Sequence, residues 1–167
     1  MIDLIMSLDY EIFGNGSGDV MRDIIKPTNR LLDIFDSYGA KLTIMFEAAE
    51  YWAFKQMEDK LDLDYSPAKA MEEQAQDVLR RGHDVQLHLH PQWIGAELDN
   101  RLWRVRINQW CIADLPHGLG DREDEYSIMG ALSKGKRTLE SMLCPIQPTY
   151  KCTAFRAGGF HIQPSSR

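Results

Sequence analysis

Two pairs of residues with metal-binding side chains stand at positions i and i+2 of this chain. Asp9 and Glu11 follow one short apolar run, and His88 and His90 close another. Because side chains alternate between the two faces of a strand, each pair is expected to project to one side. Imidazoles near a carboxylate are good ligands for a divalent ion. The spacing therefore predicts one divalent metal, zinc in the first instance, held by Glu11, His88 and His90, with cobalt, manganese or nickel as alternatives.

The elements that must position these pairs alternate along the chain. Short apolar runs predict strands, and apolar stripes bounded by caps such as Ser66-Pro67 predict helices. Strands are expected over 2–8, 41–46, 85–90 and a stretch ending at 154–155, and helices over 27–38, 48–60, 66–81 and 127–143. Residues 93–118 show no clear pattern. The alternation predicts an α/β fold with a mainly parallel sheet, and both pairs fall at its carboxyl edge, where such folds bind ligands.

Each pair alone has an ordinary interpretation. An Asp-x-Glu pair is more often a solvated strand end than a site, and a single histidine is usually a hydrogen-bonded bystander. The His-x-His pair is a stronger signal because it follows a buried strand and precedes Pro91, which turns the chain. A third segment, Arg-Ala-Gly-Gly from residue 156, also follows a predicted strand. Three such segments at strand ends favour a shared site.

These segments resemble the motifs of the polysaccharide deacetylase (NodB-like carbohydrate esterase) family. The resemblance rests on SLDYEIF at 7–13, GHDVQLHLH at 82–90 and FRAGGF at 155–160, in the family's order and over nearly the whole chain. It implies a single catalytic domain over 1–167 with a distorted (β/α) barrel. It also implies an enzyme that uses a metal to hydrolyse an N-acetyl or O-acetyl group on a carbohydrate.

Residue by residue, the resemblance implies that Asp9 is the catalytic base and Glu11 the metal carboxylate. It implies that His88 is the first metal histidine and that Arg156 orients the base. The family usually places its second histidine four positions after the first, where this chain has Gln92. The ligand role of His90 is therefore inferred from spacing alone.

The resemblance also implies later strands and a histidine general acid, for which the segment after the arginine motif has no counterpart. The barrel is accordingly expected to be incomplete at its C-terminus or completed in another way. His117 and His161 are candidates to protonate the leaving amine, and both are equally compatible with surface histidines. Trp93 directly follows the histidines and is a candidate sugar-stacking wall, although tryptophan also serves simple packing.

Composition limits the partners. The 167 residues carry a formal net charge of −6 and no lysine or arginine run, so nucleic acid and anionic lipid are not expected ligands. No apolar run reaches the ~18 residues that a membrane span needs. The N-terminal stretch lacks a basic region and a cleavage site, which favours the cytoplasm, as do three cysteines without a CxxC motif. A bridge between Cys144 and Cys152 is an unsupported alternative.

Three other functions fit parts of the pattern. Two histidines and a carboxylate with open positions also describe a non-haem iron oxygenase, although that chemistry requires neither Asp9 nor Arg156. A non-catalytic module could keep the fold without the activity, which the glutamine at position 92 would allow. A related hydrolase could act on a C–N bond of a small amide or ring, because a fold does not fix the substrate.

Overall fold

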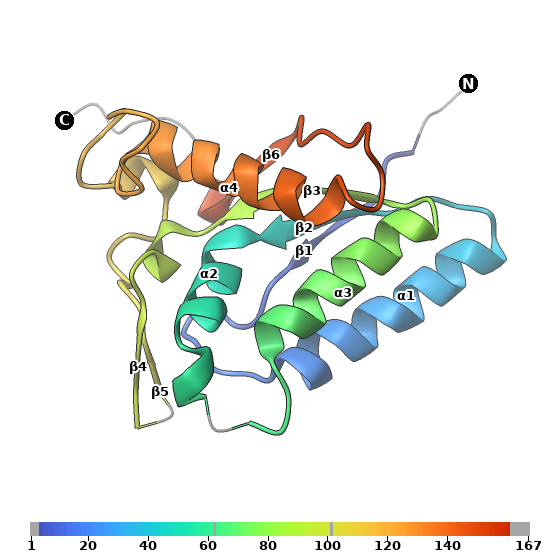
Figure 1. Cartoon of the computed structure of the whole chain (residues 1–167), viewed down its shortest axis with the longest axis horizontal. Coiled ribbons are helices and arrows are strands. Elements are labelled where there is room, and N and C mark those ends of the chain that lie inside the picture. Colours follow the sequence, from blue (N-terminus) through green and yellow to red (C-terminus); the bar gives the residue numbers. More distant parts are fainter. Residues whose placement is uncertain (1–3, 62, 101, 161–167) are drawn as a thin grey trace.

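A computed structural model describes residues 4–61, 63–100 and 102–160 and places a four-stranded parallel sheet at the centre of the chain (Figure 1). The strands run in the order β1-β2-β3-β6 and are all parallel to their neighbours. Their bounds are Ser7–Tyr10 for β1, Thr43–Glu47 for β2, Asp84–Leu89 for β3 and Phe155–Ala157 for β6. The predicted α/β class with a parallel sheet is confirmed. In the described residues this sheet is open, so a closed (β/α) barrel stays an expectation.

Four α-helices connect and cover these strands. They are α1 (Lys26–Ser37), α2 (Ala48–Gln56), α3 (Pro67–Arg80) and α4 (Ile128–Leu143). Helices α2, α3 and α4 contact one another and pack against β3, so they lie on the same face of the sheet. On the other face, Thr43, Gln86 and Phe155 line an open hollow of about 380 Å³. Only one face of the described sheet is therefore covered by helices.

The predicted helix starts follow local capping chemistry. The Ser66 hydroxyl accepts a hydrogen bond from the Lys69 amide at 3.1 Å, and the Ser127 hydroxyl accepts one from the Gly130 amide at 3.1 Å. Each satisfies an amide that has no partner within the first turn. The predicted helices 66–81 and 127–143 are confirmed to within one residue at each end.

The first strand starts later than its apolar sequence suggests. Residues 2 and 3 lie outside the described part of the chain, and Leu4 and Ile5 are exposed rather than buried. The reason is the length of the neighbouring strand, because β1 pairs only with β2, whose first residue Thr43 faces Ser7. The expectation of a buried strand over 2–8 is therefore wrong for residues 4–6, and Asp9 lies inside the strand.

The first helical segment begins earlier than predicted. A π-helical turn, η1 (Val20–Ile25), precedes α1, and the Asp19 carboxylate caps it by accepting from the Arg22 amide at 2.7 Å. Pro27, expected to open the helix, lies one residue inside α1. In the predicted apolar stripe of this helix, Leu32 is fully buried, whereas Leu31 and Ile34 are exposed.

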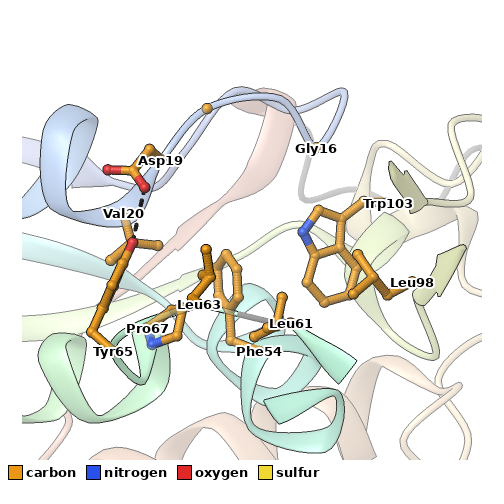
Figure 2. A pocket seen from close by; sticks show the side chains of 11 residues that line it. Gly16, Asp19, Val20, Phe54, Leu61, Leu63, Tyr65, Pro67, Leu98 and Trp103 are labelled. Atoms are coloured by element: carbon orange, nitrogen blue, oxygen red, sulfur yellow. Dashed lines mark hydrogen bonds between the residues drawn. The ribbon is translucent and has the colours of Figure 1, made fainter. Parts of the chain in front are cut away.

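The region without a sequence pattern contains a small hairpin. Strands β4 (Glu97–Asp99) and β5 (Leu102–Arg104) pair antiparallel. Elsewhere in the chain, the short 3₁₀ helices are η2 (Glu58–Lys60), η3 (Pro91–Trp93), η4 (Ile112–Asp114) and η5 (Gly158–Phe160). Trp103 of β5 packs edge-on against Phe54 of α2, with ring centroids 5.3 Å apart. Both side chains line a hollow of about 170 Å³ between the hairpin, α2 and the loop before η1 (Figure 2).

Two other expectations bear on the setting of the protein. Within the described part of the chain, each helix is too short or too polar to span a membrane. Cys144 and Cys152 are free thiols, so the alternative of a bridge between them is not supported.

Candidate metal centre

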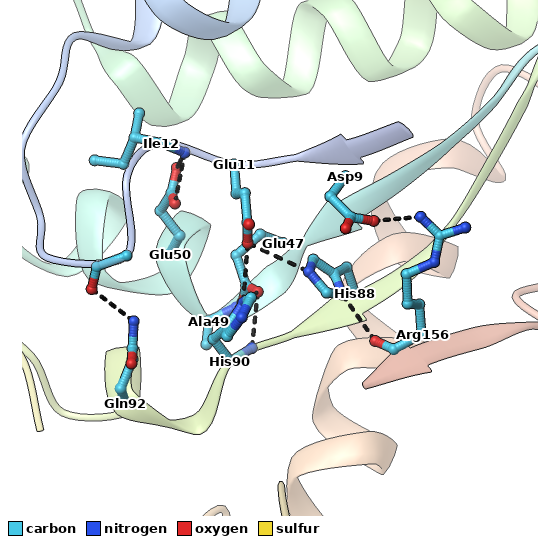
Figure 3. Close-up of polar contacts among 11 residues, drawn as sticks. Asp9, Glu11, Ile12, Glu47, Ala49, Glu50, His88, His90, Gln92 and Arg156 are labelled. Atoms are coloured by element: carbon cyan, nitrogen blue, oxygen red, sulfur yellow. Dashed lines mark hydrogen bonds and ion pairs between the residues drawn. The ribbon is translucent and has the colours of Figure 1, made fainter. Parts of the chain in front are cut away.

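Four side chains that can ligate a metal converge at the carboxyl edge of the sheet (Figure 3). Three of them, Glu11, His88 and His90, are the predicted ligands, and the fourth is Glu47. The four ligand atoms all lie within 4.8 Å of one another. The Oε2 atom of Glu11 is 3.3 Å from Nε2 of His88 and 2.9 Å from Nδ1 of His90. Oε2 of Glu47 is 3.0 Å from the same Nδ1 atom.

These separations suit a small divalent ion. A tetrahedral zinc with ligands at 2.0–2.2 Å keeps its ligand atoms about 3.4 Å apart. The contacts of 2.9–3.3 Å are close to that value, so small side-chain movements would admit the ion. The donor set of two carboxylates and two imidazoles is also one that zinc and similar metals accept.

The register of the parallel sheet brings these residues together. Tyr10 pairs with Phe46, Glu47 pairs with His88, and His88 pairs with Arg156. One row across the carboxyl edge therefore carries an acid after β1, an acid at the end of β2, a histidine in β3 and an arginine in β6. Alternation along β3 then places His90 on the same side as His88.

The environment of His88 fits a metal ligand. Its Nδ1 atom lies 2.8 Å from the carbonyl oxygen of Arg156, which can only accept, so Nδ1 carries the hydrogen. The buried Nε2 atom lies 3.3 Å from Oε2 of Glu11, in a geometry that forms no hydrogen bond. Metal-ligating histidines are commonly oriented in this way through their second ring nitrogen. A buried Nε2 atom that faces a carboxylate without a hydrogen bond is the observation that best supports a metal at this site.

Charge is strongly coupled within the cluster. Burial disfavours the ionised form of Glu11, but the interactions with His88 and His90 outweigh it and lower the pKa of Glu11 to about 2. Burial disfavours the imidazolium of His90, yet the hydrogen bonds to Glu11 and Glu47 raise its pKa to about 10. The same carboxylates raise the pKa of His88 against the effect of burial. Without a metal, a proton on His90 thus supplies the positive charge between the two acids.

A third acid, Glu50, lies beside the cluster in a different state. It is fully buried, and burial followed by the charge of Glu47 raises its pKa well above the usual range. Its two carboxyl oxygens accept from the Ile12 amide at 3.2 and 3.1 Å. Glu50 therefore anchors the backbone directly after Glu11.

The expected catalytic pair lies next to the metal ligands. An Nη1–H group of Arg156 donates to Oδ1 of Asp9, and Nη2 donates to the Ser7 hydroxyl. The side chains of Asp9 and Arg156 are 30% and 28% exposed, whereas those of His88 and His90 are almost fully buried. The structure thus brings Asp9 and Arg156 together on the open side of the centre, with Asp9 outside the group of four ligands.

Two glycines of the arginine motif allow close packing around His90. A Cβ atom on Gly158 would come within 2.4 Å of the His90 ring, so the backbone passes the ring at a distance that only glycine permits. Gly159 adopts φ +63° and lies against Trp110, whose ring contacts His90 edge-on at 5.1 Å between centroids. The arginine motif therefore supports the centre through its backbone as well as through Arg156.

Gln92 stands where the family resemblance implies a histidine. Its Nε2 group donates to the carbonyl oxygen of Gly14 at 2.7 Å, so it fastens the loop after β1. The fourth member of the cluster is Glu47, which sequence reasoning missed. One signal was available, because the second predicted strand also ends in an acid at the carboxyl edge.

The remaining expected residues have other surroundings. Trp93 is only 2% exposed and packs against Phe54 and Trp103, so the expected substrate wall at Trp93 is corrected to a core position. His117 pairs with Asp124 at 2.7 Å and packs on Tyr126. His161 lies outside the described residues.

We predict that the protein binds one divalent metal and that Glu47 contributes to binding. His88→Ala should weaken zinc binding strongly, because it removes one of the two imidazole donors and leaves three donors, the usual minimum. Glu47→Gln should weaken zinc binding by about 10–100-fold, which is the usual effect of losing a carboxylate that supports a metal site. Titration calorimetry with zinc measures both, and His117→Ala is the control with unchanged affinity. Wild-type affinity in Glu47→Gln would remove Glu47 from the site.

We predict that zinc binding strengthens as the pH rises from 6 to 8.5. The metal requires a neutral His90, and the raised pKa of about 10 means that protons compete for this nitrogen throughout that range. Affinity should increase roughly tenfold per pH unit, with release of about one proton per metal. Calorimetry in buffers of different ionisation enthalpy counts the protons. A pH-independent affinity would show that His90 is not a ligand.

We predict that Gly158→Ala weakens metal binding by displacing the His90 ring. The added methyl group would meet that ring at 2.4 Å, while the backbone at Gly158 is not in the left-handed region. Gly39→Ala is the matched control, because Gly39 has φ +63° and open space around it. That variant should lose about 1 kcal/mol of stability and keep its zinc affinity. Equal zinc affinities in the two variants would contradict the close contact at His90.

Comparison of the chain with models of known families, with curated proteins and with solved structures finds no match. The resemblance to polysaccharide deacetylases therefore rests on the three short motifs. The geometry of the centre stands independently of that resemblance.

Proposed function

We propose that this protein is a metal-dependent hydrolase that removes an acetyl group from the amino group of a carbohydrate. The observation that carries the proposal is the position of the Asp9–Arg156 pair beside the four-residue metal cluster. A divalent metal bound there would polarise the amide carbonyl and make water more acidic. The combination of a Lewis acid, a base and a charge partner suits hydrolysis of an unactivated amide.

Asp9 is the residue that moves the proton in this proposal. Its Oδ1 atom is held by Arg156, which leaves Oδ2 to accept a proton from the attacking water. The guanidinium stabilises the carboxylate in the position needed for that transfer. When the C–N bond breaks, the departing nitrogen needs one proton, and Oδ2 of Asp9 can return the proton it took. Asp9 thereby ends as a carboxylate, and the second proton of the water passes from acetic acid to the released amine, which leaves acetate and an ammonium group.

Arg156 contacts both the proposed base, Asp9, and the metal-ligand candidate His88. Its side chain orients Asp9, and its backbone carbonyl fixes the ring of His88. A substitution of the side chain keeps the carbonyl, so the two contributions are separable. Arg156 is accordingly a positioning residue for the base.

The charge of the protein favours a neutral or amine-bearing substrate. The formal net charge of −6 and the acids of the centre would repel a polyanionic chain. An N-acetylated sugar carries no charge before the reaction and gains a positive amine after it. The amine product, which is positively charged, would be repelled by the metal and attracted to the acidic protein surface.

The prediction is that protein loaded with zinc, cobalt or manganese releases acetate from N-acetylglucosamine oligomers. Asp9→Asn should lower the rate by roughly 10²–10⁴-fold, the usual contribution of a positioned general base, and should retain the metal. Asp33→Asn, at an exposed position on α1, is the matched control with wild-type rate. Acetate release and metal content are measured on the same samples.

Each outcome assigns a role. Loss of metal in Asp9→Asn would make Asp9 a ligand and overturn the division of roles. Turnover of a cyclic or acyclic amide without turnover of the sugars would place the protein among hydrolases of small C–N bonds. An absence of turnover with every amide and ester, in metal-loaded protein, would leave a non-catalytic binding module.

A further inference from the structure

We propose that Phe13, Ile107 and Trp110 form a platform that binds the apolar face of the sugar ring carrying the acetyl group. This inference rests on the proposed function and names where its substrate lies. The three side chains line an open hollow of about 480 Å³ together with Gly14, Asn15 and Ser17. The hollow lies outside the metal cluster and shares no residue with it.

Trp110 connects the platform to the metal centre. Its ring contacts His90 edge-on, with 5.1 Å between centroids, and His90 lies 2.9 Å from Glu11. Gly14 and Gly159 bring their backbones against the indole, because a Cβ atom on either would approach it to about 2.5 Å. Gln92 holds the Gly14 carbonyl. The indole is therefore fixed between two loops while it touches a metal ligand.

The platform is exposed to an unusual degree for its composition. Phe13 is 62% exposed, Ile107 is 74% exposed and Trp110 is 41% exposed. Three large apolar side chains that gather beside a polar centre mark a ligand surface more often than isolated exposed residues do. The volume also lies in the range of small-molecule sites, about 300–1,000 Å³.

The chemistry of the hollow favours a sugar ring over an acyl chain. An aromatic side chain offers a flat apolar face to the C–H groups of a pyranose. The rim offers polar groups, since Asn15 and Ser17 are exposed and hydrogen-bond to each other at 2.7 Å. Ring hydroxyls can bond to these groups while the ring lies on Trp110. A fatty acyl chain would instead need an enclosed apolar tunnel to leave water.

The test uses the outer platform residues, which do not contact His90. The double variant Phe13→Ser/Ile107→Ser should raise KM for N-acetylglucosamine tetramer on the order of tenfold and leave kcat within about threefold. KM for N-acetylethanolamine, which has no ring, should not change. Zinc content should equal that of the wild type. Ile34→Ser, an exposed isoleucine on α1, is the matched control.

A binding measurement keeps the platform separate from the reaction. Tetramer binding to zinc-loaded protein, followed by calorimetry, should weaken in the double variant whether or not acetate is released. Trp110→Phe should remove the fluorescence change caused by the sugar and keep most of the affinity. Sugar binding without turnover would support the platform and count against the deacetylase. Turnover with unchanged KM in the double variant, or tighter binding of a lipid or peptide than of the sugar, would overturn the platform.

Discussion

The charge balance at the carboxyl edge of the sheet is the constraint on which the rest of the site depends. Glu47, His88 and His90 are buried, and Glu11 is largely so. Burying like charges costs several kcal/mol per unpaired ion, so the two carboxylates need a positive charge between them. A proton on His90 meets this need in the metal-free protein, which explains its raised pKa. A divalent cation held by Glu11, Glu47, His88 and His90 would meet it more completely, because it would supply two positive charges.

Parallel pairing makes that concentration of charge unavoidable. Neighbouring parallel strands end at the same edge, so an acid after β1, an acid in β2 and a histidine in β3 are brought together by register alone. The surrounding residues then fix each group. The Arg156 carbonyl orients His88, the Ile12 amide binds Glu50, and glycine at 158 lets the chain pass His90. Backbone groups therefore orient His88 and Glu47, whereas Glu11 is held by the two histidine side chains.

The parts of the structure that depend on local sequence could be predicted, and those that depend on register could not. Caps at Ser66 and Ser127 act within four residues, so the helices they open follow directly from sequence. Glu47 follows the second predicted strand, as Glu11 follows the first, but only the register of β2 with β3 places it opposite His88. Trp93 and Trp110 are both tryptophans that follow the histidine motif in the sequence. Tertiary packing alone decides that the first lies in the core and the second beside His90.

Exposure divides the centre into a closed side and an open side. Glu47, His88 and His90 are buried, and Gly158 and Trp110 pack on the His90 ring, whereas Glu11, Asp9 and Arg156 remain 28–30% exposed. In the proposed reaction, a substrate would therefore approach on the side of Asp9, the residue proposed to receive a proton from water. Trp110 reaches the same centre from the loop side through His90. In the proposed reaction, a ring resting on the indole would lie only one side chain, His90, away from the candidate metal centre, so that one substrate could contact both.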